Sequence, residues 1–107
     1  MLSYSHQSKK MFIYFMSYTI LEYTKKKARE LNVTVKPSSK KGKKIDIIKK
    51  GEVIASVGDI NYLDYPNYIK RNGLEFANRR RELYRQRHKK DLNVVGSPGW
   101  LAGKLLW

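Results

Sequence analysis

The run RRRELYRQRHKKD, residues 79–91, places arginines, lysines and one histidine close together in the chain. Guanidinium and ammonium groups bind phosphates and carboxylates, so this run offers polyanion recognition. A second basic block, residues 36–51, is rich in lysine, whose point charge suits contacts with a phosphate backbone better than reading of bases. The residues predicted to bind a polyanion are Lys40, Lys41, Lys43, Lys44, Arg79, Arg81, Arg85, Lys89 and Lys90.

Residues 74–90 contain no Gly or Pro and predict the longest helix of the chain. At about 100° per residue, one side of this helix is apolar. That stripe consists of Phe76, Ala77, Leu83 and Tyr84. Arg80 and Arg87 fall inside the stripe, so we expect their stems to cover apolar surface and their guanidinium groups to pair with a carboxylate such as Asp91.

Residues suited to catalysis are not grouped in a comparable way. Cysteine is absent, and the two histidines, His6 and His88, have no neighbouring nucleophile or ligand pattern. The acids Asp46, Asp59, Asp64, Glu75, Glu82 and Asp91 show no spacing typical of a metal or acid/base site. No phosphate-binding loop, zinc finger or RNA-recognition motif is present. We therefore predict a protein that is not an enzyme and uses no metal or cofactor. A small nuclease remains as an alternative, ranked third after the two binding functions given at the end of this subsection.

The charge of the chain supports a binding function. Its 107 residues carry 23 Lys and Arg against 9 Asp and Glu, a net charge of +14. The two basic blocks flank a mildly acidic middle, residues 52–78. Such a field attracts nucleic acid, anionic lipid or an acidic protein surface, and does not distinguish among them. The absence of cysteine fits a reducing compartment.

The pattern of elements predicts an α+β fold. Residues 17 or 19 to 31 have helical spacing, with Leu21, Thr24 and Ala28 on one side and Asn32 as a stop. Residues 33–37 predict a short strand that ends at a proline. Two runs rich in Ile and Val surround Lys50 and predict a β-hairpin near residues 44–58. We expect this small antiparallel sheet to pack against two or three helices.

A short helix follows the hairpin. Asp64 is its candidate N-cap, Pro66 stands near its first turn and Gly73 is a suitable C-terminal stop. Tyr65 and Tyr68 lie three residues apart, and Tyr62 precedes them by the same step. These three tyrosines can stack on bases or belong to the core, and the core is the reading we prefer.

Both ends of the chain are apolar, and we expect extended terminal arms. Residues 1–15 form a predicted N-terminal extension, and residues 16–107 a single basic domain with a C-terminal hook at 96–107. The stretch MFIYFM, residues 11–16, is too short for a signal sequence or a membrane span and predicts a strand or an anchoring arm. The hook either closes the core of its own domain or inserts into a neighbouring subunit. The residues predicted to dock on other proteins are Phe12, Ile13, Phe15, Trp100, Leu105, Leu106 and Trp107.

The stretches YTKKKARELNVTVKP, KKIDIIKKGEVIASVG and YRQRHKKDLNVVGSPGWLAGKLLW give the chain a resemblance to a known group. It resembles small basic proteins of uncharacterised function encoded by large DNA viruses of algae and amoebae. The resemblance covers about residues 16–107. Its most specific residues are Tyr84, Arg87, His88, Lys89, Lys90, Gly96, Ser97, Gly99, Leu106 and Trp107. It implies a virion component, either a minor capsid protein or a protein lying against the packaged genome.

These observations lead to two expected functions. The first is a small structural protein of a large DNA virus particle, located in the virion, which bridges neighbouring capsid proteins and contacts acidic surfaces or genome. The second is a nucleic-acid-binding protein that is not part of the capsid, ignores sequence, contacts DNA or RNA through the backbone, and works in the host cytoplasm or nucleus during infection. Neither involves a small-molecule substrate or a membrane span.

Overall fold

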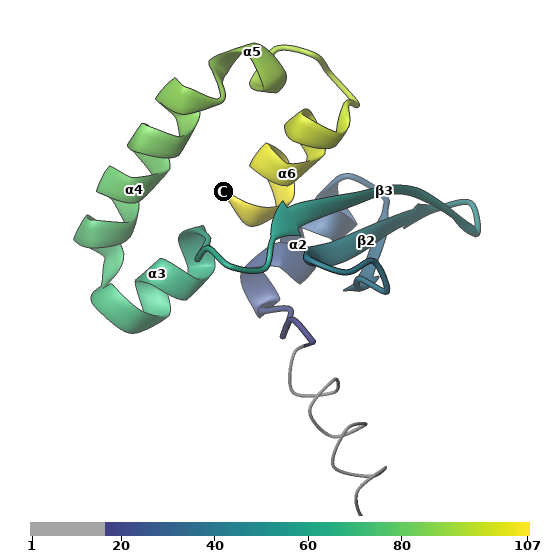
Figure 1. Cartoon of the computed structure of the whole chain (residues 1–107), viewed down its shortest axis with the longest axis horizontal. Helices are drawn as coiled ribbons and strands as arrows, with labels where there is room; N and C mark the ends of the chain where they lie inside the picture. Colours follow the sequence, from purple (N-terminus) through teal and green to yellow (C-terminus); the bar gives the residue numbers. More distant parts are fainter. Residues whose placement is uncertain (1–16) are drawn as a thin grey trace, which may run out of the picture.

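The computed structural model describes residues 17–107, which form a three-stranded antiparallel sheet and five helices (Figure 1). The elements are α2 (Glu22–Glu30), β1 (Thr34–Pro37), β2 (Lys43–Lys49), β3 (Glu52–Asp59), α3 (Tyr65–Asn72), α4 (Leu74–Arg87), α5 (Lys89–Leu92) and α6 (Pro98–Leu106). The predicted α+β class with a small antiparallel sheet is confirmed. Among the residues described, no helix has the length and apolar character needed to cross a membrane.

Helix α2 buries the side that its spacing predicted. Thr24 and Ala28 are buried, and Asn32 ends the helical region with a positive φ of 57°. The predicted start at residue 17 or 19 is wrong, because the backbone is still extended at Leu21, which precedes the first helical residue. The segment before the helix has no regular secondary structure and brings the hydroxyl of Tyr18 to Asp64.

The sheet is built around β2, which pairs with β1 on one side and β3 on the other. The β2–β3 connection is the predicted tight hairpin. Lys50 and Gly51 have φ values of 52° and 79°, the pair of positive values that a type I′ turn requires. Because β2 is central, consecutive residues of this strand, 44–47, are buried, and both of its faces are covered.

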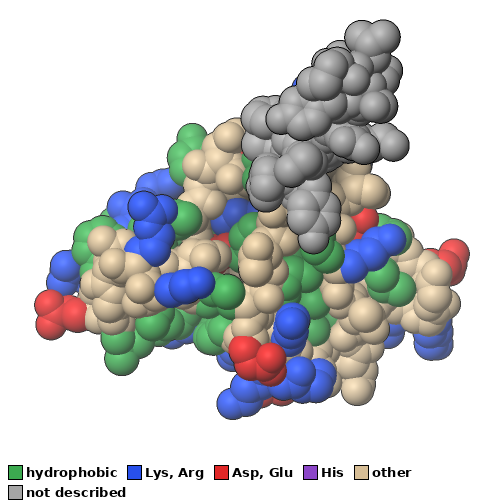
Figure 2. Space-filling view, turned by 90° about the horizontal axis from the view of Figure 1, so that it is seen from below, with side chains coloured by type: hydrophobic (Ala, Val, Ile, Leu, Met, Phe, Trp, Pro, Cys, Tyr) green, Lys and Arg blue, Asp and Glu red, His purple; other side chains and the backbone are tan. Residues whose placement is uncertain are grey.

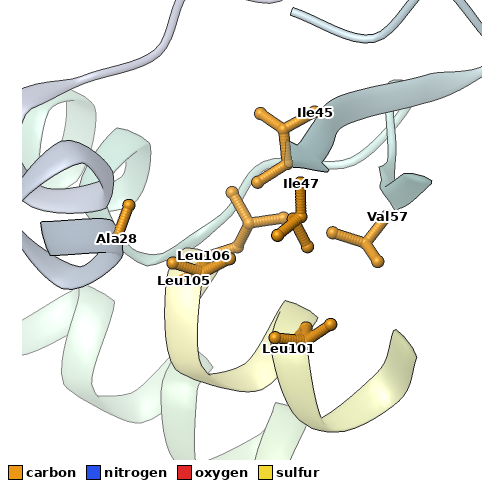
Figure 3. Packing of buried hydrophobic residues seen from close by; sticks show 7 residues of the cluster. All are labelled: Ala28, Ile45, Ile47, Val57, Leu101, Leu105 and Leu106. Atoms are coloured by element: carbon orange, nitrogen blue, oxygen red, sulfur yellow. The ribbon is translucent and has the colours of Figure 1, made fainter. Parts of the chain in front are cut away.

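The hydrophobic core lies between the sheet and α6 (Figure 3). Ile45, Ile47 and Val57 project from the sheet toward Leu101, Leu105 and Leu106 of α6, and Ala28 of α2 completes the cluster. Leu105 is 0% exposed and Leu106 is 1% exposed. Of the two alternatives for the C-terminal hook, the structure shows that it closes the core of its own domain.

Helices α3, α4 and α5 run as an arch around α6 (Figure 1). As predicted, Asp64 caps α3 by accepting from the amide of Asn67, and Gly73 ends the helix with a φ of 89°. The predicted single helix from 74 to 90 is wrong beyond Arg87, because the backbone departs from helical values at His88 (φ −108°, ψ 24°). The break turns α5 back toward α6.

Close packing of α5 on α6 depends on two glycines. A Cβ at Gly99 would meet the side chain of Asp91, and a Cβ at Gly103 would meet the side chain of Leu92. The two glycines are four residues apart and therefore lie on the same side of α6. Ser97 caps this helix, since its hydroxyl accepts from the amide of Trp100 at 3.1 Å.

The position of Leu105 leads to a first prediction. Substitution Leu105→Ala should lower the free energy of unfolding by about 2–5 kcal/mol, because it leaves a cavity at the centre of the core. Chemical denaturation monitored by tryptophan fluorescence measures this change. Val94→Ala is the matched control, since Val94 is 58% exposed, and it should change stability by less than about 0.5 kcal/mol. Equal stability of the two variants would contradict the role of the hook in the core.

Candidate nucleic-acid interface

Most of the cations predicted to bind a polyanion are exposed to solvent. They are Lys40, Lys41, Lys43, Arg79, Arg85, Lys89 and Lys90. Within residues 17–107, Arg79 alone among these forms an ion pair, with Glu75 at 3.2 Å. Lys and Arg side chains are spread across the face shown in Figure 2, with apolar areas between them. These cations are therefore available to an external anion.

One side of α4 carries Arg81 and Arg85 at a four-residue step, and Lys89 of α5 follows after the break at His88. Together with Asn78, Glu82 and Gln86 these cations line a shallow surface depression. Glu82 is the acid in this lining, and Arg85 and Lys89 supply its exposed cations.

Arg81 belongs to the fold, which corrects the prediction that it faces outward. Its Nε donates to the carbonyl oxygen of Trp107 at 2.8 Å, and a terminal nitrogen donates to the hydroxyl of Tyr23 at 3.0 Å. The guanidinium carbon lies 3.5 Å from the centre of the Tyr65 ring. This cation–π contact and the two hydrogen bonds hold α4 to α2, α3 and the C-terminal residue.

The two arginines of the predicted apolar stripe have different environments. Arg80 is half-buried and lies over the ring of Tyr68, with 5.4 Å between the guanidinium carbon and the ring centre. Its Nε is buried without a hydrogen-bond partner among the described residues. Arg87 is exposed. Neither forms an ion pair within residues 17–107, so the predicted pairing with a carboxylate is wrong for both.

Lys44 is also a residue of the interior, which corrects its prediction as a polyanion contact. It lies in the central strand and is 4% exposed. Its Nζ is 2.9 Å from a carboxylate oxygen of Asp64, whose side chain is 0% exposed. The Lys-rich stretch 36–51 gave no indication that one lysine points inward, because the acidic partner of Lys44 follows twenty residues later.

Asp64 is the centre of a buried polar network. Besides Lys44, it accepts from the hydroxyl of Tyr18, from the backbone amide of Asn67 at 3.3 Å and from the side-chain amide of Asn67 at 2.8 Å. Burial, reinforced by the neighbouring Asp64 carboxylate, raises the pKa of the Tyr18 hydroxyl well above its usual range. Tyr18 therefore remains a neutral hydrogen-bond donor.

A second buried carboxylate, Asp46, is held by serines. It is 2% exposed and accepts from the hydroxyl of Ser38 at 2.5 Å and from that of Ser56 at 2.6 Å. The backbone amide of Ser39 is a further donor at 3.4 Å. These hydrogen bonds, that of Ser38 first, hold the pKa of Asp46 below its usual range even though its removal from water acts in the opposite direction.

The aromatic side chains form a stack that ties α4 to the C-terminus. Trp107 lies on Tyr84 with 4.3 Å between ring centres and 10° between planes, and His88 stacks on Tyr84, also at 4.3 Å. Tyr65 is buried and Tyr68 is half-buried beside Trp107, as expected for core aromatics, whereas Tyr62 is 70% exposed. Sequence periodicity did not reveal this stack.

The residues predicted to dock on other proteins are mostly used inside the domain. Leu105 and Leu106 are core residues, and Trp100 and Trp107 are half-buried and pack against the core. The predicted docking residues Phe12, Ile13 and Phe15 lie outside the described residues. Val94 and Val95, which were not predicted, are 58% and 78% exposed between α5 and α6.

Sequence reasoning also missed a groove between α4, α6 and the end of β3. It has a volume of 540 Å³, within the range of ligand-binding cavities. Its cationic lining comes from Lys43, Arg80 and Arg87, with the buried Lys44 beneath, and Asp59 and Asp91 also line it. The groove exists because the arch passes around α6, and local sequence patterns do not predict this arrangement.

Comparisons of the chain with protein-family models, with curated proteins and with solved structures found no match. The chemistry of the described surface is therefore the basis for assigning a function.

The buried ion pair gives a second prediction. Lys44→Met should reduce the free energy of unfolding by about 3–5 kcal/mol, because it leaves the Asp64 carboxylate buried without a counter-charge. The double variant Lys44→Met/Asp64→Asn should recover part of this loss, since it removes the charge and retains an oxygen that can cap α3. Urea denaturation at neutral pH measures both. A double variant less stable than Lys44→Met would contradict charge burial as the cause.

The serine-bound carboxylate gives a third prediction, on pH. A depressed pKa in the folded state means that Asp46 stabilises the protein above about pH 4, the unfolded value, and that this contribution is lost as pH falls through the folded value. Asp46→Asn should therefore cost about 1.5–3 kcal/mol at neutral pH and flatten the loss of stability below about pH 4. Thermal or urea unfolding across pH 2–7 tests this, with the exposed Glu52→Gln as control. An unchanged acid profile in Asp46→Asn would refute it.

Proposed function

We propose that this protein is not an enzyme and that it binds nucleic acid without regard to sequence, through contacts with the phosphate backbone. The observation that carries the proposal is the set of exposed cations in residues 40–43 and along α4 and α5, almost none of which is paired with an acid of the described chain. Phosphates neutralised by such cations release condensed counterions, and this release supplies most of the affinity in sequence-independent binding.

The identity of the cations supports backbone contact over base reading. Of the seven exposed cations that were predicted to contact a polyanion, five are lysines, whose ammonium groups act as point charges. The arginine that is fixed in position, Arg81, is directed to the protein's own Trp107 and Tyr23. Positioned side chains that could read a base edge are thus used inside the fold, whereas the exposed ones are suited to phosphates.

A role in the particle of a large DNA virus is the second candidate. It agrees with the resemblance of residues 16–107 to small basic proteins encoded by such viruses. In that setting the basic surface would lie against the packaged genome or acidic capsid surfaces, and the protein would be found in the virion. The exposed Val94 and Val95 favour a contact with a neighbouring protein. Detection of the protein at a fixed ratio to the major capsid protein in purified particles distinguishes this candidate from a free nucleic-acid-binding protein of the infected cell.

The fourth prediction tests nucleic-acid binding by its salt dependence. Binding of a labelled duplex of random sequence should weaken steeply between 50 and 200 mM salt, with a slope in a log–log plot of about −0.9 for each phosphate neutralised. The triple variant Arg85→Ala/Lys89→Ala/Lys90→Ala should make this slope shallower by roughly 2–3 if each residue meets a phosphate. Fluorescence anisotropy over a series of salt concentrations measures both quantities.

A matched variant controls for net charge. Lys25→Ala/Lys26→Ala removes exposed lysines from α2 and should change the slope less, because these residues lie outside the proposed surface. A flat response of the parent protein to salt, or the absence of binding near physiological salt, would overturn the proposal. Equal effects per charge removed in the two variants would show that net charge acts without a defined interface.

A further inference from the structure

The groove between the arch and the sheet has walls of two kinds. One wall is α4, with Leu83 and Arg87 among its lining residues, and the other is the second half of β3. The part of α6 that includes Gly99 and Ala102 lines the space between them, where small side chains leave room. In Figure 1, α6 lies inside the arch beside β3.

The wall formed by β3 is a free sheet edge. Within residues 17–107 the order of strands is β1-β2-β3, so in this part of the chain β3 has a neighbour on one side only. Four consecutive residues of this strand, 56–59, line the groove. Because successive side chains of a strand point to opposite faces, consecutive lining residues mean that the groove runs along the edge of the sheet and not over one face.

The hydrogen-bond pattern identifies which amides face this edge. The amide of Ser38 donates to the carbonyl of Lys44, so the backbone of residue 44 faces β1. By alternation the odd-numbered residues of β2 face β3, where Ile45 pairs with Val57. In β3 the backbone groups of Val57 then face β2, and those of Ser56 face the groove. Gly58 has a φ of 86°, so the alternation does not extend to it, and the amide of Ile60 beyond it donates to the carbonyl of Gly42 on the β2 side.

The composition of this edge lacks the usual protection against added strands. Between Glu52 and Asp59, the edge strand carries no charged residue and no proline. Charged side chains and prolines are two of the means by which proteins prevent such pairing. A β-bulge is another, and the β2–β3 ladder has one between Ile47 and Ile48, outside the residues that line the groove. Val53 and Ile54 of the same strand are 51% and 48% exposed, so apolar side chains accompany the unpaired backbone.

The charges around the groove specify the chemistry of an incoming strand. Lys43, Arg80 and Arg87 line the groove, and none of them forms an ion pair within residues 17–107. Of the two acids in the lining, Asp91 is 3.5 Å from His88 and Asp59 lies at the end of β3. The cations without acidic partners favour carboxylates on the ligand.

We propose that this groove binds an extended, acidic peptide segment of another protein, which adds to β3 as the next strand of the sheet. The amide and carbonyl groups of Ser56 bind its backbone, and Arg80 and Arg87 of the opposite wall bind its carboxylates. Apolar side chains of the segment contact Leu83 and Ala102. Addition of a strand to a sheet edge is a general mode of peptide recognition, in which the backbone supplies affinity and flanking side chains supply specificity. This site shares Lys43 with the proposed nucleic-acid surface but does not include Arg85, Lys89 or Lys90.

The probe is a fluorescein-labelled decapeptide in which Glu alternates with Thr and Val. Wild-type protein should bind it, and a peptide with Lys in place of Glu should not bind. The discriminating ligand has the same sequence with N-methylated amides at every second residue, which preserves charge and removes backbone donors. Its affinity should be at least about tenfold lower, as expected for the loss of two hydrogen bonds. Equal affinity for the methylated peptide would overturn strand addition.

A matched pair of variants locates the site. Arg87→Glu reverses a charge in the groove, whereas Arg85→Glu reverses an exposed charge on the same helix outside it. Arg87→Glu should weaken peptide binding by about five- to tenfold, and Arg85→Glu should change it much less. In ¹⁵N-resolved NMR spectra, the peptide should shift the amide signal of Ser56. Equal loss in both variants, or an unshifted Ser56 signal, would overturn the proposal.

Failure of this proposal and failure of nucleic-acid binding are distinguishable. Nucleic-acid binding depends on Arg85, Lys89 and Lys90 and is measured with a duplex, whereas peptide binding depends on Arg87 and on the backbone of β3. A random-sequence duplex that fails to displace the labelled peptide supports two separate sites. Displacement in proportion to the duplex bound would show that a single basic surface receives both ligands, and would overturn the separate groove.

Discussion

A fully buried carboxylate requires a cation and hydrogen-bond donors, and Asp64 obtains them from separate parts of the chain. Lys44 comes from the central strand, Tyr18 from the segment before α2 and Asn67 from α3. These donors can meet only when the sheet, α2 and the start of the arch are all in place. The direction in which α3 leaves the sheet, and with it the position of α4, depends on this network.

The cations of the chain divide into two groups with different consequences. Lys44 and Arg81 are fixed by the fold, one by an ion pair and the other by a ring face and hydrogen bonds. The exposed cations of the described residues have few acidic neighbours. In a protein with a net charge of +14, such a surface attracts anions from outside the chain. The internal cations are held in fixed positions by specific contacts, whereas most exposed cations of the described residues have no such contacts to fix their side chains. That division suits a partner recognised by its charge and not by the detail of its sequence.

Local patterns predicted local structure well. The hairpin turn at Lys50-Gly51, the cap at Asp64 and the stop at Gly73 each depend on backbone conformations that few residue types favour, so sequence was sufficient. Contacts between distant segments were not predictable in the same way. The inward turn of Lys44 depends on Asp64, and the inward turn of Arg81 depends on rings from α2 and α3. The helical wheel predicted that Arg80 and Arg87 pack within the fold and that Arg81 faces solvent. The prediction for Arg81 was wrong because the wheel describes a single helix and does not include the packing of the arch around α6.

Helix α4 contributes a single fully buried side chain, Ala77, and is otherwise held by Arg81 and by the stack of Tyr84 on Trp107. The sheet and α6, in contrast, share the apolar core. A structure built in this way has unequal local stabilities, since the free energy needed to open an element follows the apolar contacts that it makes. The arch would then open as a unit at a lower free energy than global unfolding, with its amides exchanging hydrogen faster than those of β2. One wall of the groove would then be a cooperative unit of its own, and the space between α4 and β3 would widen while the core stays folded.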